Sequence, residues 1–170
     1  IDRYKARLVV KRCSQKAGID FFDTYSPVSK LTSIRCLLSL AAVHDFEIVQ
    51  CDVTTAFLYG ELDENIYMQQ PEGFDDGSDR VCKLEKALYG LKQAPRSFHH
   101  KIKEVLLKQK LTQSTADNCV FYKREPNKLI VCIYVDDAIV CGDTEKTVTN
   151  FLNTVQKELT ITYKPLNFFL

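Results

Sequence analysis

Residues 129–135 (LIVCIYV) form the longest apolar run in the chain, and two adjacent carboxylates, Asp136 and Asp137, end it. The run is far shorter than the roughly 20 apolar residues that span a bilayer. It is apolar on both faces, as a central strand of a sheet is. Apolar residues resume at 138–141. The pattern therefore predicts two antiparallel strands joined at a tip that carries both carboxylates.

The neighbouring segments predict the elements around this hairpin. Residues 118–123 indicate a strand before it, and Thr144 is a suitable N-cap for a helix after it. The other expected elements are strands over residues 4–12, 46–53, 66–69 and 80–84, a turn at Asp76-Gly77, and helices from Ser33 to about residue 44 and from Pro95 to about residue 110. This order predicts an α+β fold, an antiparallel sheet backed by helices.

The composition is that of an ordinary globular domain. Of the 170 residues, 45% are hydrophobic and 26% are charged. These values exclude collagen-like, low-complexity and wholly disordered chains and suit one domain. The seven cysteines form no C-x-x-C pair, so we expect buried free thiols in a reducing compartment. The chain begins without Met or a secretory leader and ends in apolar residues, and we expect it to be a segment of a longer protein.

The net charge of +1 conceals an uneven distribution along the chain. Residues 51–90 carry three basic and nine acidic groups, whereas residues 91–130 carry nine basic and three acidic groups. A polyanion could bind the basic segment while cations gather at the acidic one. Solvated surface charge is the simpler interpretation, and the charge pattern alone favours it.

The carboxylates at the hairpin tip suggest a metal site. Two adjacent carboxylates repel each other, and a divalent cation would offset that repulsion. A turn without any ligand is the alternative, because Asp favours turns. Asp52 lies near the end of the strand expected at residues 46–53. If that strand lies beside the hairpin, three carboxylates meet; Mg²⁺ takes such oxygen ligands, and the set suits two-metal phosphoryl transfer. The spacing alone leaves open whether they meet.

Other catalytic patterns are missing from the sequence. It contains no G-x-x-x-x-G-K-[ST] phosphate loop, no H-E-x-x-H and no G-x-S-x-G. His99 and His100 are adjacent on a predicted helix and point in different directions, so they do not form a metal pair. We expect both at the surface or facing nucleic acid.

Five stretches together carry a family resemblance. Tyr134-Val135-Asp136-Asp137 is similar to the Y-x-D-D box of reverse transcriptases, and residues 51–58 (CDVTTAFL) resemble the box with their first catalytic Asp. Residues 4–9, 60–74 and 87–96 resemble the copia-type retrotransposon branch. The resemblance covers nearly the whole chain in the same order. The five stretches together are far more specific than Y-x-D-D alone.

The resemblance implies a reverse transcriptase domain of a Pol polyprotein, an RNA- and DNA-templated DNA polymerase that adds dNTPs to a primer 3′-hydroxyl. The implied fold is the fingers and palm of the polymerase right hand without a thumb. Fingers are expected at about residues 1–45 and 60–95, and palm at 46–59 and 96–170. The implied partners are a primed RNA or DNA template, dNTPs and the thumb, ribonuclease H and integrase of the parent polyprotein, with no membrane. The implied location is a cytoplasmic virus-like particle, with a later nuclear phase for the DNA.

The resemblance also assigns roles to individual residues. The implied catalytic residues, which would hold two Mg²⁺ ions with Mn²⁺ as a substitute, are Asp52, Asp136 and Asp137. The implied dNTP-binding residues are Lys5 and Arg7 at the triphosphate, Phe57 as a sugar gate against the 2′-hydroxyl, Val53 and Tyr89. The implied primer and template residues are Tyr134, Val135, Gln93, Pro95 and Arg96. Without the resemblance, Phe57 would be interpreted as a core aromatic.

Two other functions stay open. Residues 163–167 are shorter than the acidic, Gly-containing stretch of the family, and the family's thumb does not follow. A degenerate or domesticated remnant that binds nucleic acid without catalysis would have such an end. An RRM-like RNA-binding module is the weaker alternative, because it needs aromatics on the sheet face, whereas this sequence places carboxylates at the edge.

Overall fold

The computed structural model describes residue 4 and residues 6–167. Its internal contacts divide the chain into two units. The first unit contains the residues up to Ser26 together with Phe57–Lys101, and the second contains Pro27–Ala56 together with the residues from Ile102 onward. The expected division into fingers and palm stays a prediction, because the units are defined by contacts alone.

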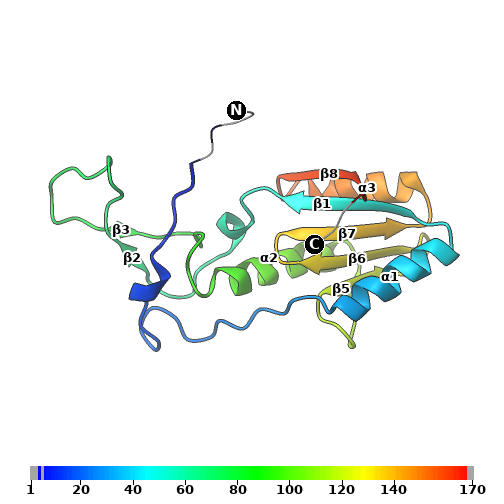
Figure 1. The fold of residues 1–170 in the computed structure, drawn as a ribbon, viewed down its shortest axis with the longest axis horizontal. Coiled ribbons are helices and arrows are strands. Elements are labelled where there is room, and N and C mark those ends of the chain that lie inside the picture. Colours follow the sequence, from blue (N-terminus) through cyan, green and yellow to red (C-terminus); the bar gives the residue numbers. More distant parts are fainter. Residues whose placement is uncertain (1–3, 5, 168–170) are drawn as a thin grey trace. The chain divides into compact units, whose positions relative to one another are not determined.

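An antiparallel sheet of six strands forms the centre of the second unit (Figure 1). In spatial order the strands are β4 (Thr112–Gln113), β5 (Val120–Lys123), β6 (Leu129–Tyr134), β7 (Asp137–Gly142), β1 (Glu47–Val53) and β8 (Ile161–Pro165). β6 lies between β5 and β7, which confirms the prediction of a central strand for the long apolar run. The α+β interpretation is also confirmed. β4 and β8 were not predicted.

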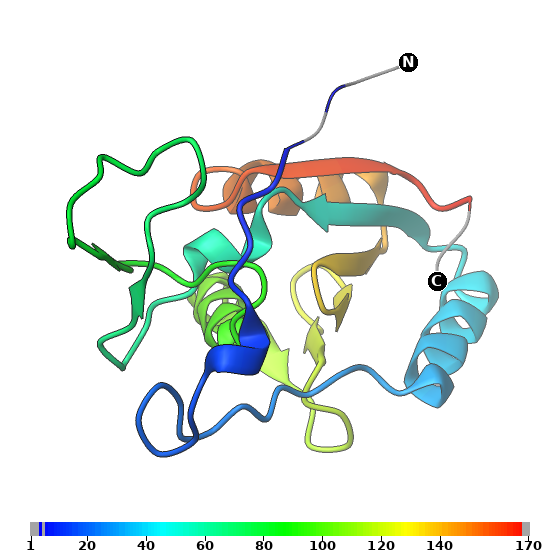
Figure 2. The same cartoon turned by 60° about the vertical axis from the view of Figure 1, so that its left-hand side comes forward.

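Helices α1 (Leu31–Val43) and α3 (Glu145–Val155) cover opposite faces of this sheet (Figures 1 and 2). Because side chains alternate along a strand, β7 supplies Ile139 and Cys141 to the core under α1. Gly142 faces the other way, and a Cβ there would lie 2.7 Å from Val148 Cγ2 of α3. Glycine at this position therefore allows α3 to approach the sheet closely.

The start of α1 differs from the prediction, and a distant carboxylate binds the residues around it. The expected N-cap was Ser33, but the N-cap is Lys30, three residues earlier, and the helix begins at Leu31. Asp117 Oδ2 accepts a hydrogen bond from the Lys30 N–H at 3.0 Å and from the Ser33 hydroxyl at 2.6 Å. Burial would raise the pKa of Asp117, but these bonds and one from the Cys119 N–H outweigh it, so that pKa is lowered. An ionised Asp117 thus stabilises the positive end of α1.

The other two helices agree with their predictions. α2 (Ala94–Lys108) buries the four residues expected on one face, Phe98, Ile102, Val105 and Leu106. In α3 the Thr144 side chain accepts from the Thr147 N–H at 3.2 Å, which confirms Thr144 as the N-cap. Together with α1 these are the three α-helices of the described residues, and none is long and apolar enough to cross a membrane.

The first unit has little regular structure. Besides the first residues of α2, it contains the short helix η1 (Arg12–Ser14) and the two-stranded sheet of β2 (Tyr67–Met68) and β3 (Cys82–Lys83). A further short helix, η2 (Ala56–Tyr59), follows β1 in the chain, where the sequence passes from the second unit to the first. The apolar cluster of the first unit is formed by Ile66, Ala87, Leu91 and Ala94.

The strand predicted at residues 4–12 is wrong for the described part of that segment, where no β-pairing occurs. A backbone hydrogen bond from the Val10 N–H to Tyr89 O at 2.9 Å joins it to the turn at residues 89–90. At Gly90, φ is +101°, and a Cβ would lie 2.2 Å from Val10 O. The segment therefore packs against a glycine turn and does not pair with a neighbouring strand.

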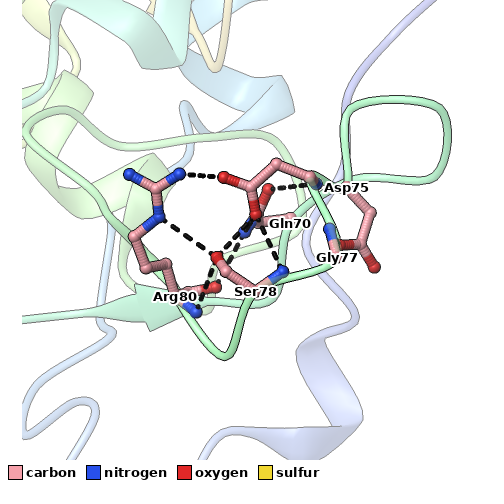
Figure 3. A network of polar contacts seen from close by, with 6 residues as sticks. Gln70, Asp75, Gly77, Ser78 and Arg80 are labelled. Atoms are coloured by element: carbon pink, nitrogen blue, oxygen red, sulfur yellow. Dashed lines mark hydrogen bonds and ion pairs between the residues drawn. The ribbon is translucent and has the colours of Figure 1, made fainter.

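A polar network holds the loop between β2 and β3 (Figure 3). Gln70 donates to Arg80 O at 3.1 Å, and its Oε1 accepts from the Asp76 N–H at 3.1 Å. Asp76 also forms an ion pair with Arg80. The predicted turn is confirmed, since Gly77 has φ +73°. These bonds lie within one exposed loop and serve to fix its shape.

All seven cysteines are free, as the sequence predicted. Burial was predicted correctly for Cys51, Cys119, Cys132 and Cys141, but Cys13 and Cys36 are exposed and Cys82 is half-buried. Burial raises the pKa of Cys51, Cys119 and Cys141 to about 12, with nearby charged groups adding to the effect. Burial also raises the pKa of Cys132, although a contact with Ser29 opposes the shift. These thiols stay protonated in the folded chain at neutral pH.

We expect the buried thiols to destabilise the fold in alkali. In the unfolded chain they lose protons near pH 9, whereas three of them keep theirs to about pH 12 when folded. The unfolded state then binds fewer protons, so their contribution is intact below pH 9 and is lost as the pH rises toward 12. Urea unfolding between pH 8 and 11 should show this decline, and Cys51→Ala should reduce its slope. An equal slope in both chains would contradict the assignment.

Candidate functional site

Two carboxylates face each other across neighbouring strands of the second unit. In the register of β1 and β7, Asp52 is the direct partner of Asp137. Directly paired residues of an antiparallel sheet have side chains on the same face, with Cβ atoms about 4.5–5.5 Å apart. Gln50, two residues before Asp52, donates to Asp137 Oδ1 at 3.4 Å. The strand of residues 46–53 therefore does lie beside the hairpin, which the sequence had left open.

The third carboxylate, Asp136, lies in the two-residue turn between β6 and β7. Its carbonyl accepts a hydrogen bond from the Val53 N–H at 2.9 Å, which ties the turn to the end of β1. Val135, the first residue of the turn, has φ +57°. This conformation is unfavourable for a β-branched residue, and such strain is concentrated at functional sites. Packing and the bond from β1 thus hold the Asp136-Asp137 tip in a fixed, strained turn.

The sheet face beside the carboxylates is hollowed. An open depression of about 340 Å³ is lined by Gln50, Asp52, Asp137, Thr162, Tyr163 and Lys164. Lys164 on β8 is the direct partner of Gln50, so its side chain lies on the same face as the carboxylates. The lining combines acceptor oxygens with one ammonium group, a composition suited to a polar ligand.

The charges of the two carboxylates also act on a thiol on the opposite side of β1. Burial is the largest cause of the raised pKa of Cys51, and the charges of Asp52 and Asp137 add to it. A site of this sign attracts cations. Carboxylate oxygens are the ligands that Mg²⁺ prefers. As they stand, however, the described residues include no group of three His, Cys, Asp or Glu side chains arranged to hold a metal ion.

A second group of expected site residues lies in the first unit. The Arg7 guanidinium carbon is 5.0 Å from the centroid of the Tyr89 ring, a cation–π distance. The Tyr89 ring lies 5.5 Å from that of Phe57, which in turn contacts the buried ring of Phe98 at 6.4 Å in an edge arrangement. Arg7 and Phe57, both expected to bind the dNTP, therefore each contact Tyr89, and the buried Phe98 contacts Phe57.

The expected template residues are held by the chain itself. Gln93 is buried. Pro95 O accepts from the Ser26 hydroxyl at 3.2 Å, and Arg96 Nη1 lies 2.9 Å from Asp23 Oδ2. Residues 15–26 thus run along residues 92–96. Nothing in the sequence predicted this long-range contact.

The remaining residues singled out from the sequence lie in different surroundings. Lys5 lies outside the described residues. Val53 is buried. Tyr134 on β6 is the direct partner of Asp137 on β7. His99 is buried, so its expected surface position is wrong, whereas His100 is exposed. The carboxylates belong to the second unit and the Arg7–Tyr89–Phe57 contacts to the first.

The fold and these residues define a chain with a carboxylate-tipped antiparallel hairpin and a separate aromatic–cation cluster. Residues 1–170 match the family described as reverse transcriptase (RNA-dependent DNA polymerase). The chain belongs to this family.

Curated relatives give its branch. The chain is 49% identical over 159 residues to the retrovirus-related Pol polyprotein from transposon TNT 1-94 of Nicotiana tabacum, covering 91% of this chain and 12% of that protein. It is 40% and 38% identical to the corresponding polyproteins from transposons RE1 and RE2 of Arabidopsis thaliana, covering 100% of this chain and 12% of each relative. These are copia-type elements. No solved structure matches the chain.

We expect Asp137→Asn to stabilise the fold when no divalent cation is present. The substitution removes a like charge directly opposite Asp52, which is worth about 0.2–1 kcal/mol. Urea unfolding in EDTA would measure the gain in the free energy of unfolding. Asp52→Asn provides the matched test, because either single change removes the same repulsion and the double variant should gain little more. Fully additive gains would show that the two carboxylates do not interact.

Proposed function

We propose that this chain is the catalytic core of an RNA- and DNA-templated DNA polymerase that adds dNTPs to a primer 3′-hydroxyl. The observation that carries the proposal is the placement of Asp52 opposite Asp137, with Asp136 in the adjoining turn tied to β1. Family membership supports the same activity. The chain spans 12% of the length of its curated plant relatives, so the activity of the parent polyprotein belongs to this proposal as well.

The three carboxylates would hold two Mg²⁺ ions, with Mn²⁺ as a substitute. When bound, such ions lower the pKa of an attacking hydroxyl and stabilise the leaving pyrophosphate. Asp52 and Asp137 would supply oxygens from adjacent strands, and Asp136 would supply a third carboxylate from the turn. The Val53 N–H bond to Asp136 O fixes the turn, so these oxygens need little reorganisation. Tyr134 and Val135 would lie near the primer terminus.

The first unit would bind the incoming nucleotide. Arg7 presents a guanidinium suited to phosphate oxygens, and Lys5 would assist it. The Tyr89 ring, half exposed and stacked under Arg7, offers a surface for the sugar or base. Phe57 would act as the sugar gate, because its ring is held between Tyr89 and the buried Phe98 and has little freedom to yield to a 2′-hydroxyl. Val53, which belongs to the second unit, is the remaining residue proposed to bind the dNTP.

The setting of the proposed enzyme follows from the relatives' names, which are Pol polyproteins of transposons. We propose that the parent polyprotein also supplies a thumb, ribonuclease H and integrase, and that a primed RNA or DNA template is the substrate. A virus-like particle in the cytoplasm, with a nuclear phase for the DNA, is the corresponding location. A remnant that binds nucleic acid without catalysis is the alternative.

Primer extension tests the catalytic assignment. On a primed homopolymeric RNA template with Mg²⁺ or Mn²⁺, Asp136→Asn should reduce dNTP incorporation about 100-fold or more, the usual cost of removing one group that stabilises the transition state. Asp45→Asn is the matched control, since Asp45 is an exposed residue that precedes the opposite end of β1. Equal extension by the Asp136→Asn chain and the native chain would sink the assignment. Salt-sensitive binding of primer–template by a folded chain, without extension, would favour the remnant.

Phe57→Val tests the sugar gate. Shortening the ring should admit rNTPs and lower dNTP-over-rNTP selectivity roughly 10- to 200-fold, the range that a small change in an apolar pocket gives. The measurement is kcat/KM for dNTP and rNTP on one template. Phe74→Val, at an exposed aromatic of the same unit, should leave selectivity unchanged. Unaltered selectivity in Phe57→Val would refute the gate.

A further inference from the structure

Gln93 lies at the centre of a buried polar network in the first unit. Its side chain is 2% exposed. Gln93 Nε2 donates to Asp20 O at 2.8 Å and to Glu64 Oε2 at 3.2 Å, and Gln93 Oε1 accepts from Gln15 Nε2 at 3.0 Å. Both amide hydrogens are thus used, and the oxygen already accepts one hydrogen bond. Because the side chain is also buried, it presents no accessible group to a template base.

The orientation of the Gln93 amide is fixed by its partners. A flipped amide would place its oxygen against a carbonyl and a carboxylate, and its NH₂ against the Gln15 NH₂. Such a buried arrangement would leave several groups unsatisfied, at considerable cost. The network therefore has one stable form, which is typical of polar clusters that specify a unique arrangement.

The network joins the segment that carries Arg7 to the turn that carries Tyr89. Gln15 Oε1 accepts from the Lys92 N–H at 2.8 Å. Gln15 therefore binds both the backbone next to Gln93 and, through its own Nε2, the Gln93 side chain. Upstream of Gln15, the Val10 N–H donates to Tyr89 O at 2.9 Å. The Arg7–Tyr89 contact lies at the end of this series of bonds.

We propose that Gln93 is a positioning residue that holds the N-terminal segment against the Tyr89 turn and thereby sets the Arg7–Tyr89 pair, and that it does not contact the template. The identity of that pair as a nucleotide site rests on the proposed function. The positioning itself rests on the hydrogen bonds and can be measured without polymerase activity.

Hydrogen exchange in the full 170-residue chain tests the proposal. Gln93→Glu turns a donor into an acceptor that faces Asp20 O and the Glu64 carboxylate. The Lys92 and Val10 amides should then exchange about tenfold faster, within the range that coupled polar groups show. Adding Glu64→Gln returns an amide donor opposite the new carboxylate and should restore most of the protection. Gln15→Leu, which leaves residue 93 intact, should accelerate the same two amides.

The control is Ile66→Val, which lowers the stability of the same unit through a buried apolar contact. It should leave the ratio of Val10 to Leu91 amide exchange unchanged, whereas Gln93→Glu should raise that ratio. Unchanged exchange in Gln93→Glu, or no restoration by Glu64→Gln, would overturn the proposal.

The affinity for a primer–template separates positioning from template contact. Measured by fluorescence anisotropy, the Kd of the Gln93→Glu/Glu64→Gln chain should stay within about twofold of the native value. A Kd weakened equally in the single and the double variant would support direct template contact and overturn the proposal. A native chain that binds no primer–template would count against the proposed function alone, because the exchange measurement would still decide the role of Gln93.

Discussion

The pairing of β1 with β7 is the interaction on which the rest of the second unit depends. Its register places Cys51 and Val53 in the core and leaves Asp52 on the opposite face, directly across from Asp137. A slip of one residue would bury the carboxylate and expose the apolar residues, so the core enforces the position of the charges. The bond from Val53 to the Asp136 carbonyl extends this control to the turn. Hydrophobic burial thus determines where the polar groups meet.

This arrangement lowers the stability of the fold through several weak effects. Adjacent and opposed carboxylates repel one another, and Val135 occupies a left-handed conformation that β-branched residues avoid. Packing of the buried strands β6 and β7 against α1 holds the tip in this unfavourable arrangement. The start of α1 is in turn bound by Asp117 from another part of the chain. A strained, charged tip at the end of the most apolar hairpin lowers the stability of the fold, and such strain is concentrated at functional sites.

Sequence periodicity predicted the elements whose stability is local or strongly apolar. The β6–β7 hairpin, α2 and the Thr144 cap of α3 follow from patterns within about 15 residues. The elements that were missed depend on distant partners. Ser33 was expected to cap α1, but its hydroxyl bonds to Asp117, 84 residues away. The strand expected at residues 4–12 has the residue types of a strand, but its described residues pair with no other strand. Residue type and order along the sequence identified the site carboxylates, whereas the pairing of Asp52 with Asp137 follows only from the register of β1 and β7.

The motif at residues 87–96 shows why a family signature is not a catalogue of ligand contacts. Ala87, Leu91 and Ala94 are buried in the apolar cluster of the first unit, and Gly90 is required by the close approach of Val10. Gln93 is buried in a polar network. Tyr89, by contrast, is 51% exposed and stacks under Arg7. Packing therefore accounts for most of the motif, and its exposed part reduces to one aromatic ring whose position the other residues determine. The long motif and the single exposed contact are explained by the same structure, since a ring on an irregular turn can be placed only by the residues around it.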